Sequence, residues 1–425
     1  MESTMDNAAI RAAIAALLPE AQAFLCELLR FPSTPGQEHE AMIWLDQRFR
    51  QAGIAVERAP MDNSLKQDPD YSTPVPDLDY AGRFNLRARY PGRGGGKTIL
   101  FNVHTDVVPP SEGQPSPWEP RLEGDTIFAR GACDDKGPLT ALFLVFRTLQ
   151  TLRADLPGDV LAHLVCEEEN GGNGSLAMVR GGEQADGCVV LEPTARQLFT
   201  SIRGAVWFRL VLHGRAGHSG QAGRTRSALL MARDAMAILE TYHDELLAAS
   251  RGLPLFDPYP NPMPITFGKL QAGNWPAAAP SRAVLEGVLG LLPNKTKEHV
   301  CAEMRQALLA GGRFAESDFE LSFMYRHDSS VVDPSHELPQ GLLRAAKSVD
   351  VALTIAAMTA SCDAWFYANQ LGIPAVVYGP GTLAVAHSKD EQIAMADIAE
   401  AAAVLTRFVL DACGGPPCRA EETDA

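Results

Sequence analysis

Hydrophobic residues recur at helical spacing in two N-terminal segments, 10–29 and 38–52. Gly53 follows the second segment, and glycine is favoured just after the last turn of a helix. We therefore expect two surface helices that cover a sheet. The next segment, 58–83, is rich in Pro, Asp and Ser and has no hydrophobic period, so it predicts a long loop without regular structure.

Beyond residue 84, short apolar segments alternate with segments of helical period. The predicted strands are 84–90, 98–103, 160–166 and 187–191, and the predicted helix among them is 139–152. Strands that alternate with helices predict an α/β fold with a mostly parallel sheet covered by helices.

The pattern changes after residue 200 to the order β-α-β-β-α-β, which predicts a ferredoxin-like α+β module. Its strands are expected at 205–212, 265–270, 283–291 and 319–326, and its helices at 227–247 and 297–309. The earlier pattern returns from about residue 338, with a strand at 375–378 and a helix at 393–412. We therefore predict one α/β domain in two parts, 1–202 and 330–413, an inserted module at 203–329, and a disordered tail at 414–425.

Composition narrows the possible partners. The 425 residues are enough for two domains, and 37 Lys and Arg against 52 Asp and Glu give a formal charge of -15, which disfavours nucleic acid and anionic lipid. We find no apolar stretch near the roughly 20 residues that cross a bilayer and expect no membrane partner and a cytoplasmic location. Eight cysteines are scattered singly, without a CxxC pair, so we expect free thiols.

The first chemical motif is the apolar strand 101–106 (FNVHTD), which presents His104 and Asp106 on one face. A neutral imidazole is a good zinc ligand, and a nearby carboxylate commonly orients the ring. We predict His104 as a metal ligand and Asp106 as its orienting residue. Alone, such a pair is more often a structural hydrogen bond.

Acidic residues follow in 130–137 (RGACDDKG), where a helix is expected to begin. Acids at a helix start usually cap it. Because one carboxylate has two oxygens, Asp134 is predicted to bridge two cations. Asp135 is a weaker candidate that could serve only as a cap.

Three glutamates, Glu167, Glu168 and Glu169, follow the apolar segment 160–166 at the end of the sheet where ligands bind in α/β proteins. A solvated acidic turn is the simpler interpretation. A metal would offset the repulsion among these carboxylates, so we predict Glu169 as a ligand and Glu168 as a general base.

Glu192 ends another apolar segment, and His387 lies in a loop after a Gly-Pro-Gly turn. Together, two histidines and three carboxylates suit two divalent ions that share a carboxylate and a bridging hydroxide. Zinc is the expected metal, with cobalt or manganese as alternatives. Glu168 would take the proton of the water and return it to the leaving amine.

His218 lies in the glycine-rich segment 214–220 (GRAGHSG) of the inserted module. We predict that it reaches over the metals as a donor to the tetrahedral oxyanion. The alternative is an exposed loop histidine without a catalytic role.

These motifs, in this order and spacing, resemble the family of acetylornithine deacetylase, succinyl-diaminopimelate desuccinylase, carboxypeptidase G and the aminoacylases, from about residue 25 to the last helix. The resemblance implies a di-zinc domain interrupted by a lid that forms homodimers. It also implies the ligand roles: His104 and Glu192 on one zinc, Glu169 and His387 on the other, and Asp134 on both. His218 would then act in the same chain or in the partner's active site.

The chain departs from the family pattern at three places. Residues 277–281 (AAAPS) stand where many members have NVVPS, residues 288–290 (VLG) replace an Asp-x-Arg, and Trp365 replaces the Arg that commonly follows Asp363 by two positions. The arginine of Asp-x-Arg often meets a substrate carboxylate, and such pairs are strong. Its absence argues against a glutamate carboxypeptidase.

The predicted function is metal-dependent hydrolysis of the amide bond in small N-acylated amino acids or amines. A dipeptidase or carboxypeptidase on the same metal site is the first alternative. A non-catalytic binding protein is a remote one, because such a protein would be expected to lose a ligand or Glu168. A phosphate loop and a serine nucleophile elbow are excluded by the order of elements and by the absence of a G-x-S-x-G motif.

Overall fold

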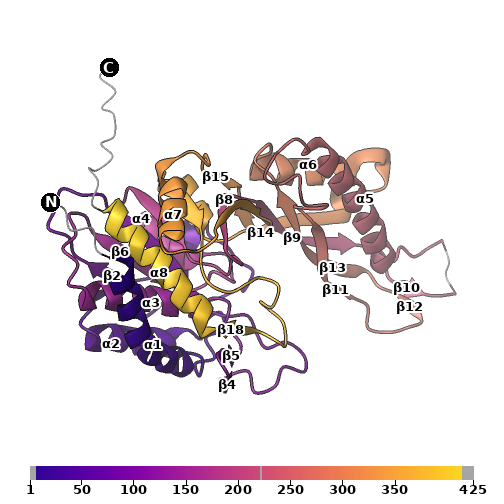
Figure 1. The fold of residues 1–425 in the computed structure, drawn as a ribbon. Coiled ribbons are helices and arrows are strands. Elements are labelled where there is room, and N and C mark those ends of the chain that lie inside the picture. The colour runs from indigo at the N-terminus through magenta and orange to yellow at the C-terminus, as the bar shows by residue number, and fades with distance from the viewer. Residues whose placement is uncertain (1–5, 221–222, 414–425) are drawn as a thin grey trace.

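The computed structural model describes residues 6–220 and 223–413, which form two bodies joined side by side (Figure 1). The larger body combines the N-terminal and C-terminal parts of the chain, and the smaller is built from its middle. The predicted disordered tail, 414–425, lies outside the described residues. The domain boundaries at 203 and 329 remain our proposal.

A nine-stranded mixed sheet forms the centre of the larger body, in the order β1-β2-β6-β3-β7-β17-β8-β15, with β16 also paired to β8. β6, β3, β7 and β17 are mutually parallel, while β1, β2 and β15 add antiparallel edges. The α/β class is thus confirmed, and the parallel strands form the middle of the sheet. The strand bounds are Ala55–Pro60 (β1), Phe84–Tyr90 (β2), Ile99–His104 (β3), Val160–Val165 (β6), Gly187–Val190 (β7), Gln197–Ile202 (β8), Ser330–Val331 (β15), Thr354–Met358 (β16) and Ala375–Val377 (β17).

Helices cover both faces of this sheet, which is why every residue of β3 and β6 is buried. Alternate residues of β3 enter different cores: Phe101 packs in the large core with five helices, and Leu100 packs in a second core with α4. The helices of the large core are Asn7–Leu28 (α1), His39–Gln51 (α2), Lys136–Thr151 (α3), Glu337–Ser348 (α7) and Met395–Ala412 (α8). The other face carries Asn173–Arg180 (α4) and the short helix Phe366–Gln370 (η4).

By length and composition, α1 is apolar enough to cross a bilayer, so the expectation that no segment qualifies was wrong. In the fold this apolar surface is used for packing. Phe24, Leu25 and Leu28 are fully buried, and the Phe24 ring stacks on Phe143 of α3 with centroids 4.2 Å apart. α1 thus packs one apolar face against the core of the larger body.

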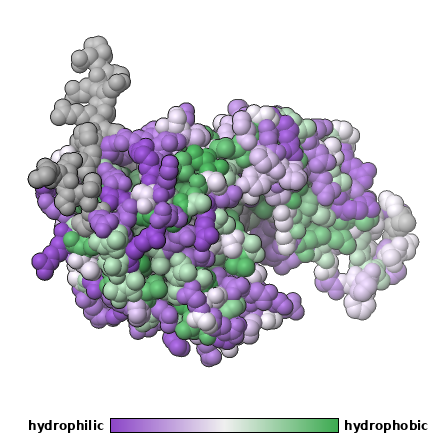
Figure 2. Space-filling view, viewed as in Figure 1, coloured by the Kyte–Doolittle hydropathy of each residue, from purple (hydrophilic) through white to green (hydrophobic). Residues whose placement is uncertain are grey.

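The smaller body is an antiparallel sheet in the order β11-β13-β9-β14, packed against α5 and α6. This order and the β-α-β-β-α-β sequence of elements are those of a ferredoxin-like module, as predicted. The bounds are Gly204–His213 (β9), Ala228–Ala249 (α5), Ile265–Ala272 (β11), Arg282–Leu291 (β13), Lys297–Leu309 (α6) and Phe319–His327 (β14). On the face shown in Figure 2, the surface is hollowed between the two bodies.

Two further small sheets lie outside these bodies' main sheets. One pairs Gly217–His218 (β10) with Ala278–Ala279 (β12), and the other joins Arg121–Glu123 (β4), Thr126–Phe128 (β5) and Gln392–Ala394 (β18). Three 3-10 helices complete the assignment, at Asn63–Gln67 (η1), Ala310–Gly312 (η2) and Glu316–Asp318 (η3).

The segment expected to lack structure, 58–83, is partly regular. β1 reaches Pro60 and pairs with β2 along its whole length, and η1 follows it. Val56 is the only buried residue of β1, because the strand lies at the sheet edge. An edge strand with one buried side chain carries almost no alternating pattern, which explains why the sequence did not reveal it.

We expect Phe24→Ala to lower the free energy of unfolding by about 3–5 kcal/mol, since it empties a fully buried ring position between α1 and α3. The urea midpoint of unfolding measures this. Leu122→Ala, at a largely exposed position, is the matched control and should change stability by less than about 0.5 kcal/mol. An equal effect of both changes would contradict the packing described for α1.

Candidate metal centre

The predicted ligands converge at the carboxyl ends of the central parallel strands. His104 ends β3, the three glutamates follow β6, and Glu192 comes two residues after β7. Asp134 lies just before α3. Neighbouring parallel strands end at one edge of a sheet, so segments distant in sequence meet there.

The Asp134 carboxylate lies between two histidines. Its Oδ1 is 3.0 Å from Nε2 of His104, and its Oδ2 is 3.2 Å from Nε2 of His387. His387 Nε2 also lies 2.8 Å from Oε1 of Glu169. Each oxygen of Asp134 therefore faces a different histidine, as a bridging carboxylate requires.

Two groups of possible metal ligands result, and they share Asp134. One contains His104, Asp134, Asp135 and Glu192, and the other contains Asp134, Glu169 and His387, with one ligand atom of each residue within 4.8 Å of the others in its group. Imidazole nitrogens and carboxylate oxygens are the donors that zinc and similar ions take. The residues present thus fit two divalent ions.

The concentration of carboxylates supports the same conclusion. Burial raises the pKa of Glu168, Glu192 and Asp135 well above their usual range, and neighbouring carboxylates raise them further. Bound divalent cations act in the opposite direction, because they stabilise the ionised carboxylates. The side chains are therefore arranged for a site that contains positive charge.

Asp106 holds two parts of the site together. Its carboxylate accepts hydrogen bonds from the main-chain N–H groups of Glu168 and Glu169, at 3.1 and 3.0 Å. Its main-chain oxygen lies 3.0 Å from Nδ1 of His104, which leaves Nε2 directed at Asp134. Asp106 therefore positions the glutamate segment as well as the histidine ring.

The three glutamates have different environments. Glu167 is buried in an ion pair of 2.5 Å with Arg83 and accepts hydrogen bonds from Tyr80 and Asn173 at 2.8 and 3.0 Å. The Glu168 carboxylate, in contrast, accepts no hydrogen bond from the residues that the structure describes, and it lies beside the cluster. The segment thus provides one structural anchor, one free carboxylate and one candidate ligand.

Asp135 is not a capping side chain. It occupies the N-cap position of α3 but makes no capping hydrogen bond, and its Oδ2 instead accepts the main-chain N–H of His104 at 3.3 Å. The interpretation of Asp135 as only a cap is therefore corrected. Its carboxylate belongs to the group around His104.

His218 is not brought to the cluster within one chain. It lies in β10 on the smaller body, far from the strand ends of the larger body in Figure 1. The side chain is exposed, and its Nδ1 accepts the N–H of Gly220 at 3.1 Å. An action within one chain is not supported by this arrangement, and an action in a partner's site stays a prediction.

The sequence did not reveal Glu391 and Arg130, a buried ion pair that supports the main chain at Asp134. Glu391 Oε1 accepts the N–H groups of Cys133 and Asp134, both at 3.1 Å, while its Oε2 pairs with Arg130 at 2.5 Å. All these groups are buried. No local pattern marks Glu391, because its role depends on a contact between distant segments.

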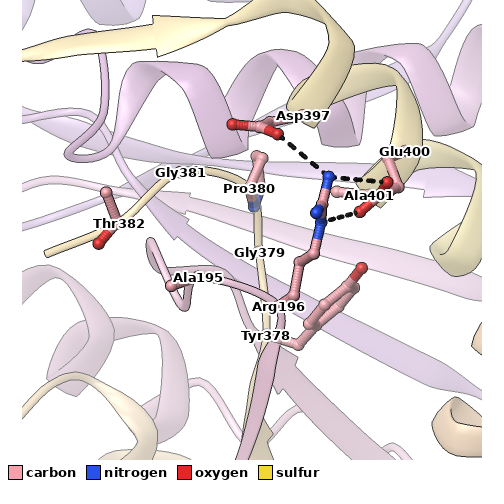
Figure 3. A pocket seen from close by; sticks show the side chains of 10 residues that line it. All are labelled: Ala195, Arg196, Tyr378, Gly379, Pro380, Gly381, Thr382, Asp397, Glu400 and Ala401. Carbon is pink, nitrogen blue, oxygen red and sulfur yellow. Dashed lines mark hydrogen bonds and ion pairs between the residues drawn. The ribbon is translucent and has the colours of Figure 1, made fainter. Parts of the chain in front are cut away.

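A cavity of about 290 Å³ lies next to the segment that leads to His387 (Figure 3). It is lined by residues 379–382 and by Arg196, which pairs with Glu400 at 2.6 Å and with Asp397 at 3.8 Å. These ion pairs occupy its charged groups, and none of the predicted ligands lines it. The cavity is separate from the cluster.

Comparison with known proteins agrees with this arrangement. The sequence profile of Peptidase family M20/M25/M40 matches residues 100–411, which is most of the chain and contains all the predicted ligands. The chain belongs to this family. It is accordingly a metal-dependent hydrolase that acts on amide or peptide bonds.

Among the relatives of this M20 protein, an acetylornithine deacetylase of Myxococcus xanthus is 26% identical over 412 residues, covering 94% of this chain and 99% of the relative. An N-formyl-4-amino-5-aminomethyl-2-methylpyrimidine deformylase of Bacillus subtilis is 24% identical and covers 74% of this chain and 79% of its own. The dipeptidase Dug1p of Saccharomyces cerevisiae superposes with a TM-score of 0.78 at 14% identity, over 97% of this chain and 100% of that chain. At this low identity, the similarity to Dug1p shows that the two proteins share a fold.

We expect zinc binding to the metal-free protein at pH 7 to release protons. The carboxylates of Asp134 and Glu169 raise the pKa of His387 to about 11, so the imidazole is protonated at pH 7, whereas a metal binds its neutral form. Isothermal titration calorimetry in two buffers of different ionisation enthalpy measures the proton count. A binding enthalpy independent of the buffer would contradict this expectation.

Proposed function

We propose that the chain hydrolyses the amide bond of small N-acylated amino acids, as a deacylase with two metal ions. The observation that carries the proposal is the position of Asp134 between His104 and His387, with the free carboxylate of Glu168 beside them. The full-length similarity to an acetylornithine deacetylase supports this substrate class.

The ligand roles follow from the two groups of donors. His104 and Glu192 would hold one ion, Glu169 and His387 the other, and Asp134 both. Zinc suits these donors best, and cobalt or manganese are alternatives. When bound, the ions would polarise the substrate carbonyl and lower the pKa of a water molecule.

The protein's own groups would then move the proton. Glu168 would take a proton from the attacking water and transfer it to the nitrogen of the leaving amine. This role requires a carboxylate near the reacting atoms that is not engaged in other hydrogen bonds. Glu168 meets the second condition, because it accepts no hydrogen bond from the described residues. Asp106 fixes its main chain and so limits where the carboxylate can move.

We further propose a homodimer formed through the smaller body, which acts as a lid. β11 is an edge strand of its sheet, and edge strands with free main-chain groups pair readily with another chain. Exposed apolar side chains also occur on the smaller body, namely Leu229 and Leu230 of α5, Leu270 of β11, and Trp275. In such a dimer, His218 would reach the partner's site as an oxyanion donor.

A dipeptidase is the second candidate, since the dipeptidase Dug1p shares the fold over nearly the whole chain. A carboxypeptidase would use the same metal site as well. A non-catalytic protein is disfavoured because Glu168 and all five predicted ligands are present. A cytoplasmic location is part of the proposal.

Purified protein should hydrolyse members of a panel of N-acetyl, N-formyl and N-succinyl amino acids faster than dipeptides. EDTA should abolish turnover, and zinc should restore it. Glu168→Gln should lower kcat by about 100- to 10,000-fold while zinc binding persists, since only the proton acceptor is removed. The exposed Glu57→Gln is the control for loss of a carboxylate. Turnover confined to dipeptides would favour the second candidate, and full activity of Glu168→Gln would refute its role.

His218→Ala and Glu168→Gln should each be nearly inactive, and an equal mixture should recover about one quarter of the wild-type activity, because mixed dimers contain one intact site. Size-exclusion chromatography with light scattering establishes the dimer first. Unchanged turnover of His218→Ala would refute the role of this residue, and a mixture without recovery would refute its action in the partner's site.

A further inference from the structure

His387 differs from the other predicted ligands in how the chain carries it. The others lie in or close to a strand end or the start of α3, whereas His387 lies within the long loop between β17 and β18. Its side chain is 50% exposed, and its φ of 57° is in the left-handed region, which residues other than glycine rarely adopt. Such a conformation persists only where surrounding contacts hold it. A contact at His387 is therefore required.

Ser111 supplies this contact, from the segment that follows Asp106. Its Oγ donates to the main-chain oxygen of His387 at 2.8 Å and accepts a hydrogen bond from Nη2 of Arg130, also at 2.8 Å. A guanidinium can only donate, and a hydroxyl has a single hydrogen to give. Arg130 thus directs the one hydrogen of Ser111 to the carbonyl of His387.

The main chain of Ser111 is held independently of its hydroxyl. The N–H of Gln114 donates to the carbonyl of Ser111 at 3.0 Å, and the side-chain oxygen of Gln114 accepts the N–H of Ser111 at 3.2 Å. Both main-chain groups are therefore occupied. Removal of the hydroxyl should leave this turn in place and affect the contacts to His387 and Arg130.

The loop of His387 is tied to the segment before α3 near both of its ends. Near its start, the main-chain groups of Thr382 bond to Sγ of Cys133 at 3.2 and 3.3 Å. Near its end, Glu391 pairs with Arg130. Ser111 holds the loop between these points, at the residue that reaches the metal centre.

The buried guanidinium of Arg130 connects the two halves of the centre. Its Nη1 pairs with Glu391, which accepts the main-chain N–H of Asp134 at 3.1 Å, and its Nη2 donates to Ser111. The planar guanidinium offers several donors in fixed directions, so it can serve both partners at once. One arginine thus supports the bridging carboxylate through Glu391 and His387 through Ser111.

We propose that Ser111 is a positioning residue for His387, and that its hydroxyl sets the affinity of the metal ion held by Glu169 and His387. The proposal rests on the two-metal arrangement of the proposed function but not on the substrate. Without the hydroxyl, the carbonyl of His387 and Nη2 of Arg130 would each lose a partner. The imidazole would then be held less firmly opposite Glu169 and would bind metal more weakly.

Zinc binding to the metal-free protein tests this role without turnover. Competition with a coloured chelator measures the affinities of both ions. His387→Ala should bind one ion tightly in place of two, and so identifies the affinity that belongs to the His387 site. Ser111→Ala should weaken binding at that site about 10- to 100-fold and change the other affinity by less than about threefold. Ser111→Thr keeps the hydroxyl and should bind both ions nearly as the wild type does.

Ser348→Ala is the matched control, because its hydroxyl also donates to a main-chain oxygen, that of Ala345, at 2.8 Å but at the end of α7. It should bind both ions as the wild type does, and thermal unfolding confirms that the variants are folded. Unchanged affinities in Ser111→Ala, an equal loss at both sites, or an equal loss in Ser111→Thr would overturn the inference and leave the ligand roles intact. If His387→Ala still binds two ions tightly, the ligand roles fail, and the inference fails with them.

Discussion

The arrangement of the site depends on where the Asp134 carboxylate is held. Both of its oxygens must face different histidines, and the side chain alone would not fix this orientation. Glu391 accepts hydrogen bonds from the main-chain N–H groups of Cys133 and Asp134, and Arg130 pairs with the second oxygen of Glu391. Since all three groups are buried, the ion pair has little freedom to rearrange. The loop before α3, the strand end at His104 and the loop of His387 can then meet at one carboxylate.

Much of this site could be predicted because its residues follow buried strands. His104, Glu169 and Glu192 each come at the end of an apolar segment, and the carboxyl ends of parallel strands must meet at one edge of a sheet. The inserted module was similarly evident from the order of its strands and helices. These features are local in sequence, and the packing only brings them together.

What could not be predicted depends on contacts between distant segments. Glu391 lies in an ordinary polar loop and becomes important only because the fold places it behind Asp134. The edge strand β1 escaped detection for a related reason, since it buries one side chain and has no periodicity. His218 lies in the inserted module, but a single sequence does not show that this module places it away from the metal centre of its own chain.

The acidic segment after β6 has a consequence for how this protein can vary. Consecutive residues have three different surroundings: Glu167 pairs with Arg83, Glu168 lies beside the cluster without a hydrogen-bond partner among the described residues, and Glu169 lies against His387. A deletion or insertion of one residue there would preserve three acidic residues in composition but exchange their surroundings. We therefore expect the segment to tolerate neither an insertion nor a deletion, whereas exposed loops of the smaller body can change in length without moving a ligand. Designed or natural variants of this chain are best aligned on that segment first.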